Sequence, residues 1–220
     1  VLTRLADGRV LAAGGTDDSG HNLPVADADL YDPATDTWSA TASMTVTRTL
    51  HDAALLPYSS GTTGLTKGVR LSHRNLVSNI CQAASTLGFT GSDTSIAVLP
   101  FFHAYGLQIL MNMGLNAGAT VVTMPRFDLE QFLSLHQQYG VTRSFVAPPI
   151  VLALAKHPLV DSYDLSSLTQ IISGAAPLSA ELADEAAARI GCEVIQGYGM
   201  TELTTVAHLP VPGGSKPGSV

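Results

Sequence analysis

YSSGTTGLTKGV, residues 58–69, has the composition of a loop that binds phosphate. Its glycines let backbone N–H groups approach an anion, its hydroxyls donate hydrogen bonds, and Lys67 adds a mobile positive charge. The hydroxyls belong to Ser59, Ser60, Thr62 and Thr63, and the glycines are Gly61 and Gly64. A Walker A motif is excluded, because it requires glycine directly before the lysine and Thr66 stands there. The alternative is a flexible polar linker, but the strands expected on both sides favour an ordered phosphate loop.

From about residue 52 onward, apolar β-rich segments alternate with segments of helical periodicity. We expect strands over residues 53–58, 94–99, 119–124, 142–146, 170–173 and 193–196. We expect helices over residues 73–87 after Ser72, 105–116 before Gly118, from Asp128 to Gly140, and 180–190 between Ser179 and Gly191. This alternation predicts an α/β fold, a mainly parallel sheet with helices on both faces. Ligands of such sheets bind in the loops at the carboxyl ends of the strands.

Residues 1–51 have a different pattern, of short strands broken by turns. We expect strands at residues 9–13 and 28–31 and a turn at residues 32–36. The pair Gly14-Gly15 together with Tyr31 and Trp38 resembles one kelch repeat, while the alternative is a generic β-meander. Because a propeller blade is stabilised by its neighbours, we expect residues 1–51 to form a single, incomplete and poorly packed kelch-like β segment. The change of pattern indicates a fusion, with the join between Arg48 and Pro57.

Composition limits the partners and the compartment. The 220-residue chain is 45% hydrophobic with a formal net charge of −7, so we expect no nucleic-acid partner, since such binding needs clustered Lys and Arg. The longest apolar run, residues 144–155, is too short to span a bilayer and contains two prolines. Cys81 and Cys192 make no disulfide framework, which fits a cytoplasmic location. Since the chain begins at Val1 rather than Met, we expect it to be part of something longer.

Three further motifs follow the phosphate loop. They are LPFFHAYGL at residues 99–107, ISGAAPL at 172–178 and QGYGMTE at 196–202. In sequence and in order, the four motifs resemble those of the adenylate-forming, AMP-binding superfamily, which includes acyl-CoA synthetases, 4-coumarate:CoA ligases, luciferases and peptide-synthetase adenylation domains. Thr66 replaces the family's proline, a change expected to affect loop mobility more than chemistry. The resemblance implies that residues 52–220 form half of an adenylate-forming N-terminal domain.

The resemblance also implies roles for individual residues. The ATP phosphates would contact Ser59, Ser60, Gly61, Thr62, Thr63, Gly64 and Lys67. The adenine and acyl sites would be lined by Gly174, Ala175 and Ala176, and the adenine pocket by Gln196, Gly197, Tyr198 and Gly199, with Tyr198 stacking on the base. Thr201 would bind the α-phosphate, Glu202 would hold Mg²⁺, and His103 and Tyr105 would lie at the acyl channel. The catalytic set would be Lys67, His103, Thr201 and Glu202.

Each of these residues taken alone has a simpler explanation. An isolated Glu202 is more often a solvated surface carboxylate, and an isolated Tyr198 more often packs in a core. A lone His103 beside aromatic residues is usually structural. Across the sequence, the seven histidines lack zinc-ligand spacing and no GxSxG elbow occurs, which argues against a zinc site and an esterase. Only the order of the four motifs therefore supports the roles above.

By this resemblance the chain is a fragment of an AMP-forming acid–CoA ligase. Such an enzyme uses ATP and Mg²⁺ to activate a fatty or aromatic carboxylic acid as its acyl-adenylate, and CoA then accepts the acyl group. The family's ribose-binding Asp and its late catalytic Lys would lie beyond Val220, so we expect the chain to be inactive alone. The alternative is a kelch-propeller interaction protein that carries a non-catalytic AMP-binding-like passenger. The sequence indicates no oligomeric state.

Overall fold

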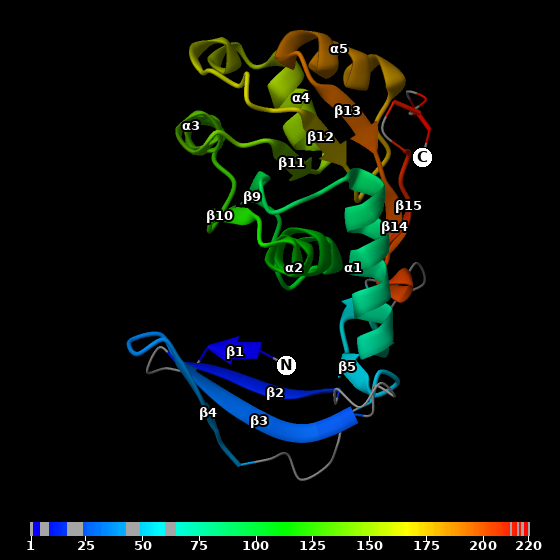
Figure 1. Cartoon of the computed structure of the whole chain (residues 1–220). Helices are drawn as coiled ribbons and strands as arrows, with labels where there is room; N and C mark the ends of the chain where they lie inside the picture. The colour runs from blue at the N-terminus through cyan, green and yellow to red at the C-terminus, as the bar shows by residue number, and fades with distance from the viewer. Residues whose placement is uncertain are drawn as a thin grey trace. The chain divides into compact units, whose positions relative to one another are not determined.

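The computed structural model describes residues 2–4, 9–16, 24–42, 49–59, 65–211, 213–214, 216 and 218–219. The chain divides into two units, Val1–Asp52 and Ala53–Val220, which are described separately. Figure 1 shows both units, with labels on many of their elements.

The first unit is an antiparallel sheet whose strands follow one another in chain order. Its strands are β1 (Leu2–Arg4), β2 (Val10–Thr16), β3 (Pro24–Asp32) and β4 (Thr37–Ala40). At the expected turn, the Ala34 N–H donates to the Asp32 carboxylate at 2.9 Å, and Tyr31 and Trp38 pair with their ring centroids 5.1 Å apart. The strand expected to stop at residue 13 instead continues through Gly14-Gly15, because a bulge between Ala13 and Gly15 absorbs the irregular register.

The second unit is built on five parallel strands in the order β10-β9-β11-β12-β13. Their bounds are Thr94–Ala97 for β9, Thr120–Thr123 for β10, Arg143–Val146 for β11, Gln170–Ser173 for β12 and Glu193–Gln196 for β13. All four pairings between neighbouring strands are parallel. Every residue of β12 is buried, as expected for a strand covered on both faces. The predicted α/β fold is confirmed.

Capping residues place the helices that cover this sheet. Helix α1 (His73–Leu87) begins at Ser72, which forms a capping box with Asn75. Helices α3 (Leu129–Tyr139) and α5 (Ala180–Ile190) begin after Asp128 and Ser179, whose side chains accept backbone N–H bonds. The helices α1, α3 and α5 end at glycines in the left-handed conformation, Gly88, Gly140 and Gly191.

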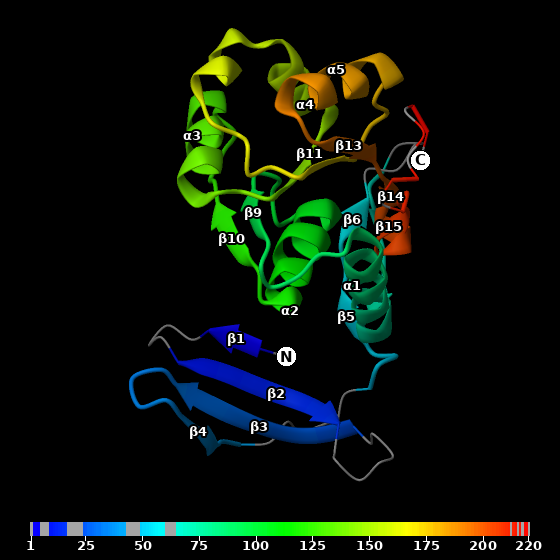
Figure 2. The same ribbon diagram turned by 45° about the horizontal axis from the view of Figure 1, so that its top comes forward.

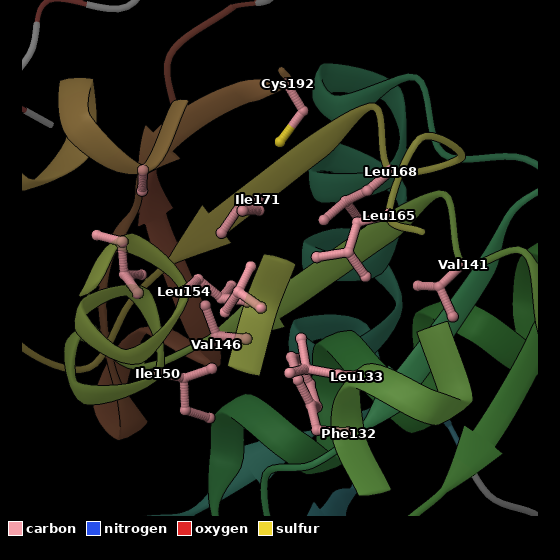
Figure 3. Packing of buried hydrophobic residues seen from close by; sticks show 14 of the residues in the cluster. Phe132, Leu133, Val141, Val146, Ile150, Leu154, Leu165, Leu168, Ile171 and Cys192 are labelled. Carbon is pink, nitrogen blue, oxygen red and sulfur yellow. The ribbon is translucent and has the colours of Figure 1, made fainter. Parts of the chain in front are cut away.

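Two buried clusters lie on opposite faces of the sheet, because neighbouring residues of a strand point to opposite sides. Val146 and Ile171 face a cluster that includes Phe132 and Leu133 of α3 and Leu154 of helix α4 (Pro148–Lys156). Figure 3 shows this cluster. Their neighbours face a second cluster. That cluster contains Phe145, Ile172, Ile80, Leu87, Ile109, Leu110 and Met113. Both faces of the sheet are therefore covered by helices, as Figures 1 and 2 show.

The segment expected as one buried strand over residues 53–58 is two short strands outside the parallel sheet. β5 (Ala53–Leu55) pairs antiparallel with β8 (Leu71–Ser72), and β6 (Tyr58–Ser59) pairs antiparallel with β7 (Lys67–Gly68). Pro57 has no N–H to continue a ladder, which accounts for the break. The expectation of burial was also wrong, since Leu56 is 63% exposed and Tyr58 is 74% exposed.

Two helical segments differ from expectation. The helix expected at 105–116 is a π-helical segment, η1 (Gly106–Met113), continued by α2 (Gly114–Ala117) and ended by Gly118. Helix α4 (Pro148–Lys156) and the 3-10 turn η2 (Pro158–Ser162) were not expected from the sequence. The pair Pro148-Pro149 looked like an interruption, but proline is favourable in the first turn of a helix, where an N–H has no intrahelical partner. No helix in the described part of the chain combines the length and apolarity needed to cross a membrane.

Candidate nucleotide site

A cavity of about 670 Å³ in the second unit is lined by residues from all four motifs. The wall includes the segments that directly follow β12 and β13, so the cavity lies at the carboxyl edge of the sheet, where ligands of parallel sheets bind. Its motif residues are Tyr58, Ser59, Lys67, Phe102, His103, Ala104, Tyr105, Ile172, Gly174, Ala175, Gly197, Tyr198, Gly199, Met200, Thr201 and Glu202. Segments more than a hundred residues apart in the sequence thus share one site.

The first and fourth motifs are in direct contact. The Ser59 hydroxyl donates to the Glu202 carboxylate with an Oγ–Oε1 distance of 2.9 Å. Ser59 also pairs with Lys67 across the β6–β7 ribbon. Among the described residues that line the cavity, Lys67 and Glu202 are the only charged ones. The Ser59 hydroxyl and the Glu202 carboxylate therefore meet at the wall of a cavity that Lys67 also lines.

The Tyr105 side chain contacts the backbone of the third motif. Its hydroxyl donates to the backbone carbonyl of Ile172 at 3.0 Å, and burial raises its pKa, so it remains protonated. A Cβ on Gly174 would lie 2.9 Å from the Tyr105 ring, so only glycine permits this close approach. The next residue, Ala175, adopts a φ of 72°, an uncommon conformation for alanine that the surrounding contacts must maintain.

His103 lies on the cavity wall and is exposed. Its Nδ1 accepts the backbone N–H of Tyr105 at 3.2 Å, so the neutral ring carries its proton on Nε2. The neighbouring Phe102 is 90% exposed and also lines the cavity. The second motif therefore brings an imidazole and an aromatic ring to the cavity.

The fourth motif provides the first strand of a short hairpin, β14 (Tyr198–Met200). The 3-10 turn η3 (Thr201–Leu203) joins it to the second strand, β15 (Thr205–His208), which follows the motif. Tyr198 is 47% exposed, and its ring centroid lies 5.8 Å from that of His208, its cross-strand partner. Tyr198 is therefore partly accessible at the cavity wall. A Cβ on Gly199 would lie 1.5 Å from the carbonyl oxygen of Thr205, so the hairpin requires glycine there.

Two expected site residues lie outside the described cavity wall. Gln196 is buried, and its side-chain oxygen accepts the Leu178 N–H at 2.5 Å, which fixes the end of the third motif. Ala176 is exposed next to the lining residue Ala175. The remaining expected phosphate-loop residues, Ser60, Gly61, Thr62, Thr63 and Gly64, lie outside the residues that the structure describes.

Sequence reasoning missed the inner wall of the cavity. Leu87, Ile109 and Phe145 line it and belong to the cluster between the sheet and α1. Periodicity predicts that such residues are buried, but it does not distinguish a packed position from one beside a cavity. Thr205 was also missed, and it lines the cavity while its hydroxyl donates to the Ala104 carbonyl at 3.0 Å.

Glu202 supplies the one carboxylate among the described residues of the cavity wall. In the described ranges, no three His, Cys, Asp or Glu residues come together as a metal cluster. Mg²⁺, however, is usually held by one or two carboxylates together with water and substrate phosphates. The single carboxylate of Glu202 beside Lys67 and Ser59 fits that second arrangement.

Comparison with known proteins agrees with this fold and cavity. The family model described as "AMP-binding enzyme" matches residues 8–220, and the chain belongs to this family. It is 45% identical over 172 residues to the probable 4-coumarate–CoA ligase 1 of Dictyostelium discoideum, a match covering 76% of this chain and 31% of that protein. It is 48% identical over 160 residues to 4-coumarate–CoA ligase 1 of Petroselinum crispum, covering 70% and 29%. The chain thus spans about a third of the length of the curated relatives it matches.

Two solved structures have a similar fold. ATP-bound MatB from Rhodopseudomonas palustris superposes with a TM-score of 0.74 at 34% identity, covering 83% of this chain and 36% of that one. The anthranilate CoA ligase AuaEII, in complex with anthranoyl-AMP, superposes with a TM-score of 0.71 at 26% identity, covering 84% and 35%.

Proposed function

We propose that this chain provides the ATP-binding core of an AMP-forming acid–CoA ligase, which activates a carboxylic acid as an acyl-adenylate and passes the acyl group to CoA. The observation that carries the proposal is the meeting of four separate motifs at one cavity, with Ser59 bonded to Glu202. The 4-coumarate–CoA ligase relatives and the ATP-bound structural neighbour support the same assignment.

The phosphates of ATP bind at the charged side of the cavity. When the acid attacks the α-phosphorus, negative charge develops on the phosphoryl oxygens and on the leaving pyrophosphate. Lys67 and the hydroxyl of Thr201 stabilise that charge, and Ser59, Ser60, Thr62 and Thr63 donate to the phosphates with the N–H groups around Gly61 and Gly64. Glu202 would hold Mg²⁺, which would neutralise further phosphate charge when bound.

The adenine base binds against the fourth motif. Tyr198 offers its ring for stacking, and Gly197 and Gly199 leave room for the base. The turn formed by Gly174, Ala175 and Ala176 borders the base and the acyl group. Gln196 contributes from outside the cavity by holding the Leu178 N–H.

The acyl group occupies the apolar inner part of the cavity. Leu87, Ile109 and Phe145 line that part, and the charged residues Lys67 and Glu202 lie with the nucleotide motifs. Such a wall favours an aromatic or fatty acid, whose carboxylate is the single polar end. His103 lies beside the carboxylate and orients it, and Tyr105 shapes the channel by supporting the Gly174 turn.

For the first unit we propose a kelch-type blade fused to the ligase part, with the boundary between residues 51 and 52. The antiparallel four-stranded meander and the division of the chain at Asp52 support this. The AMP-binding family match begins at residue 8 and includes most of this unit, which counts against the blade and against the alternative function, a kelch-propeller interaction protein with an inert passenger. The compartment proposed for the protein is the cytoplasm.

Calorimetric titration of the chain with ATP and Mg²⁺ tests the proposal. We expect weak but measurable binding, which Lys67→Ala weakens by about tenfold because it removes a charge-assisted contact to phosphate. Lys216→Ala, at an exposed lysine outside the candidate site, is the control and should leave affinity unchanged. Absence of ATP binding at millimolar concentration, or equal affinity of the two variants, would contradict the proposal.

A further inference from the structure

The hairpin that carries Tyr198 and Glu202 packs against the core through Val206 of β15, whereas its other strand, β14, has no buried residue. All three residues of β14 are exposed, and Leu203 in the connecting turn is 46% exposed. The turn is also strained, since Thr204 and Thr205 have φ values of 63° and 103°. Positive φ is unfavourable for β-branched residues and persists only where surrounding contacts impose it. Other parts of the unit must therefore hold this hairpin in place.

Three polar contacts from three different elements do so. Glu202 accepts from Ser59 at 2.9 Å, and Thr205 donates to the Ala104 carbonyl at 3.0 Å. The third contact comes from Asn79 in the middle of α1, whose Nδ2 donates to the Val206 carbonyl at 2.7 Å. The Val206 N–H donates back to Asn79 Oδ1 at 3.4 Å.

Asn79 therefore acts on β15 as the peptide group of a neighbouring strand would. Val206 lies opposite Gly199 in the two-stranded ribbon. Its N–H and C=O both form hydrogen bonds with the side-chain amide of Asn79. Asn79 is 6% exposed and lies between apolar residues of the face that α1 buries. A buried amide at such a position is costly unless both its donor and its acceptor are satisfied, and Val206 satisfies both.

We propose that Asn79 is a positioning residue for the nucleotide site. It does not line the described cavity, and it acts through the β14–β15 hairpin, which α1 contacts in both views of the unit (Figures 1 and 2). By fixing Val206 it maintains the strained turn and with it the places of Tyr198, Thr201 and Glu202. The link to nucleotide binding rests on the function proposed above, whereas the effect on the hairpin does not.

Hydrogen exchange of the ligand-free chain and ATP titration together test this proposal. Asn79→Leu keeps the branched shape of the side chain and removes both hydrogen bonds. Asn79→Ala removes the same bonds with a smaller side chain that is favourable within a helix. We expect either variant to increase amide exchange over residues 203–208 by about tenfold while β11 and β12 keep their protection. ATP affinity should fall by a similar factor.

Asn112→Leu is the matched control. Asn112 is a half-buried amide of η1 that donates to Gln108 at 3.0 Å, so its loss should lower overall stability without selective exchange in the hairpin. Uniform loss of protection in the Asn79 variants, or loosening of the hairpin with unchanged ATP affinity, would overturn the positioning role. If the unmodified chain binds no ATP, the proposed function fails, and the exchange result alone decides whether Asn79 holds the hairpin.

Discussion

The imidazole of His136 is 1% exposed and bonded at both nitrogens within the core. Nδ1 lies 2.7 Å from the Phe132 carbonyl, which can only accept, so Nδ1 carries the proton and Nε2 accepts from the Ser144 hydroxyl at 3.2 Å. A charged imidazolium could not accept that second bond. Burial lowers the pKa of His136 from 6.5 to about 4, although the bond to Phe132 opposes the shift.

The pH dependence of stability follows from this pKa. Below pH 6.5 the unfolded chain binds a proton at His136 that the folded chain does not bind until about pH 4, so stability falls as pH falls through that range. We expect urea unfolding to show a loss of about 2 kcal/mol at His136 between about pH 7 and pH 5. His136→Asn retains a donor for the Phe132 carbonyl and cannot titrate. The stability that this variant loses between about pH 7 and pH 5 should therefore be smaller by about 2 kcal/mol. An unchanged slope in the variant would contradict the assignment.

At the scale of single elements, Arg189 joins two helices. From α5 its guanidinium donates to the Leu154, Ala155 and His157 carbonyls at the end of α4, at 2.9 to 3.2 Å, and it pairs with Asp161 at 2.8 Å. The last carbonyls of a helix lack intrahelical partners, so this residue satisfies groups that would otherwise be left unbonded.

Arg189→Leu should therefore lower the free energy of unfolding by about 2 to 3 kcal/mol, as measured by urea denaturation followed by helical circular dichroism. Arg189→Lys should recover only part of this, because an ammonium group cannot span the same set of carbonyls. Asp161→Asn is the control for the ion pair alone and should cost less than about 1 kcal/mol, since Asp161 is exposed. Equal losses for Arg189→Leu and Asp161→Asn would show that the carbonyl contacts contribute nothing.

The elements that sequence reasoning placed well are those with local signals. The bounds of α1 and α5 agree with the expectation because Ser72, Ser179 and their terminal glycines are capping signals within a few residues. The π-helical geometry of η1 has no such signal. Gly106 lies so close to the preceding segment that a Cβ would be 2.3 Å from the Pro100 carbonyl oxygen, a contact set by tertiary packing.

At the scale of the whole molecule, order along the chain predicted which segments share a site, but not how they touch. Residues from all four motifs line the cavity, as the resemblance implied. Gln196 and Ala176 do not line it, and residues 60–64 of the phosphate loop lie outside the described residues. The Ser59–Glu202 contact joins residues 143 positions apart, and the Asn79–Val206 contact joins residues 127 apart. Pairings at such separations depend on the assembled sheet, so no local pattern in one sequence encodes them.

The most direct test of the shared site is hydrogen exchange of the intact chain with and without ATP and Mg²⁺. We expect nucleotide to slow exchange in peptides from residues 58–69, 172–178 and 196–202 together and to leave α3 and α5 unaffected. These three segments belong to different elements, and all three contribute residues to the cavity wall. Protection in one of them alone, or protection confined to segments outside the cavity, would contradict the claim that the motifs form a single nucleotide site.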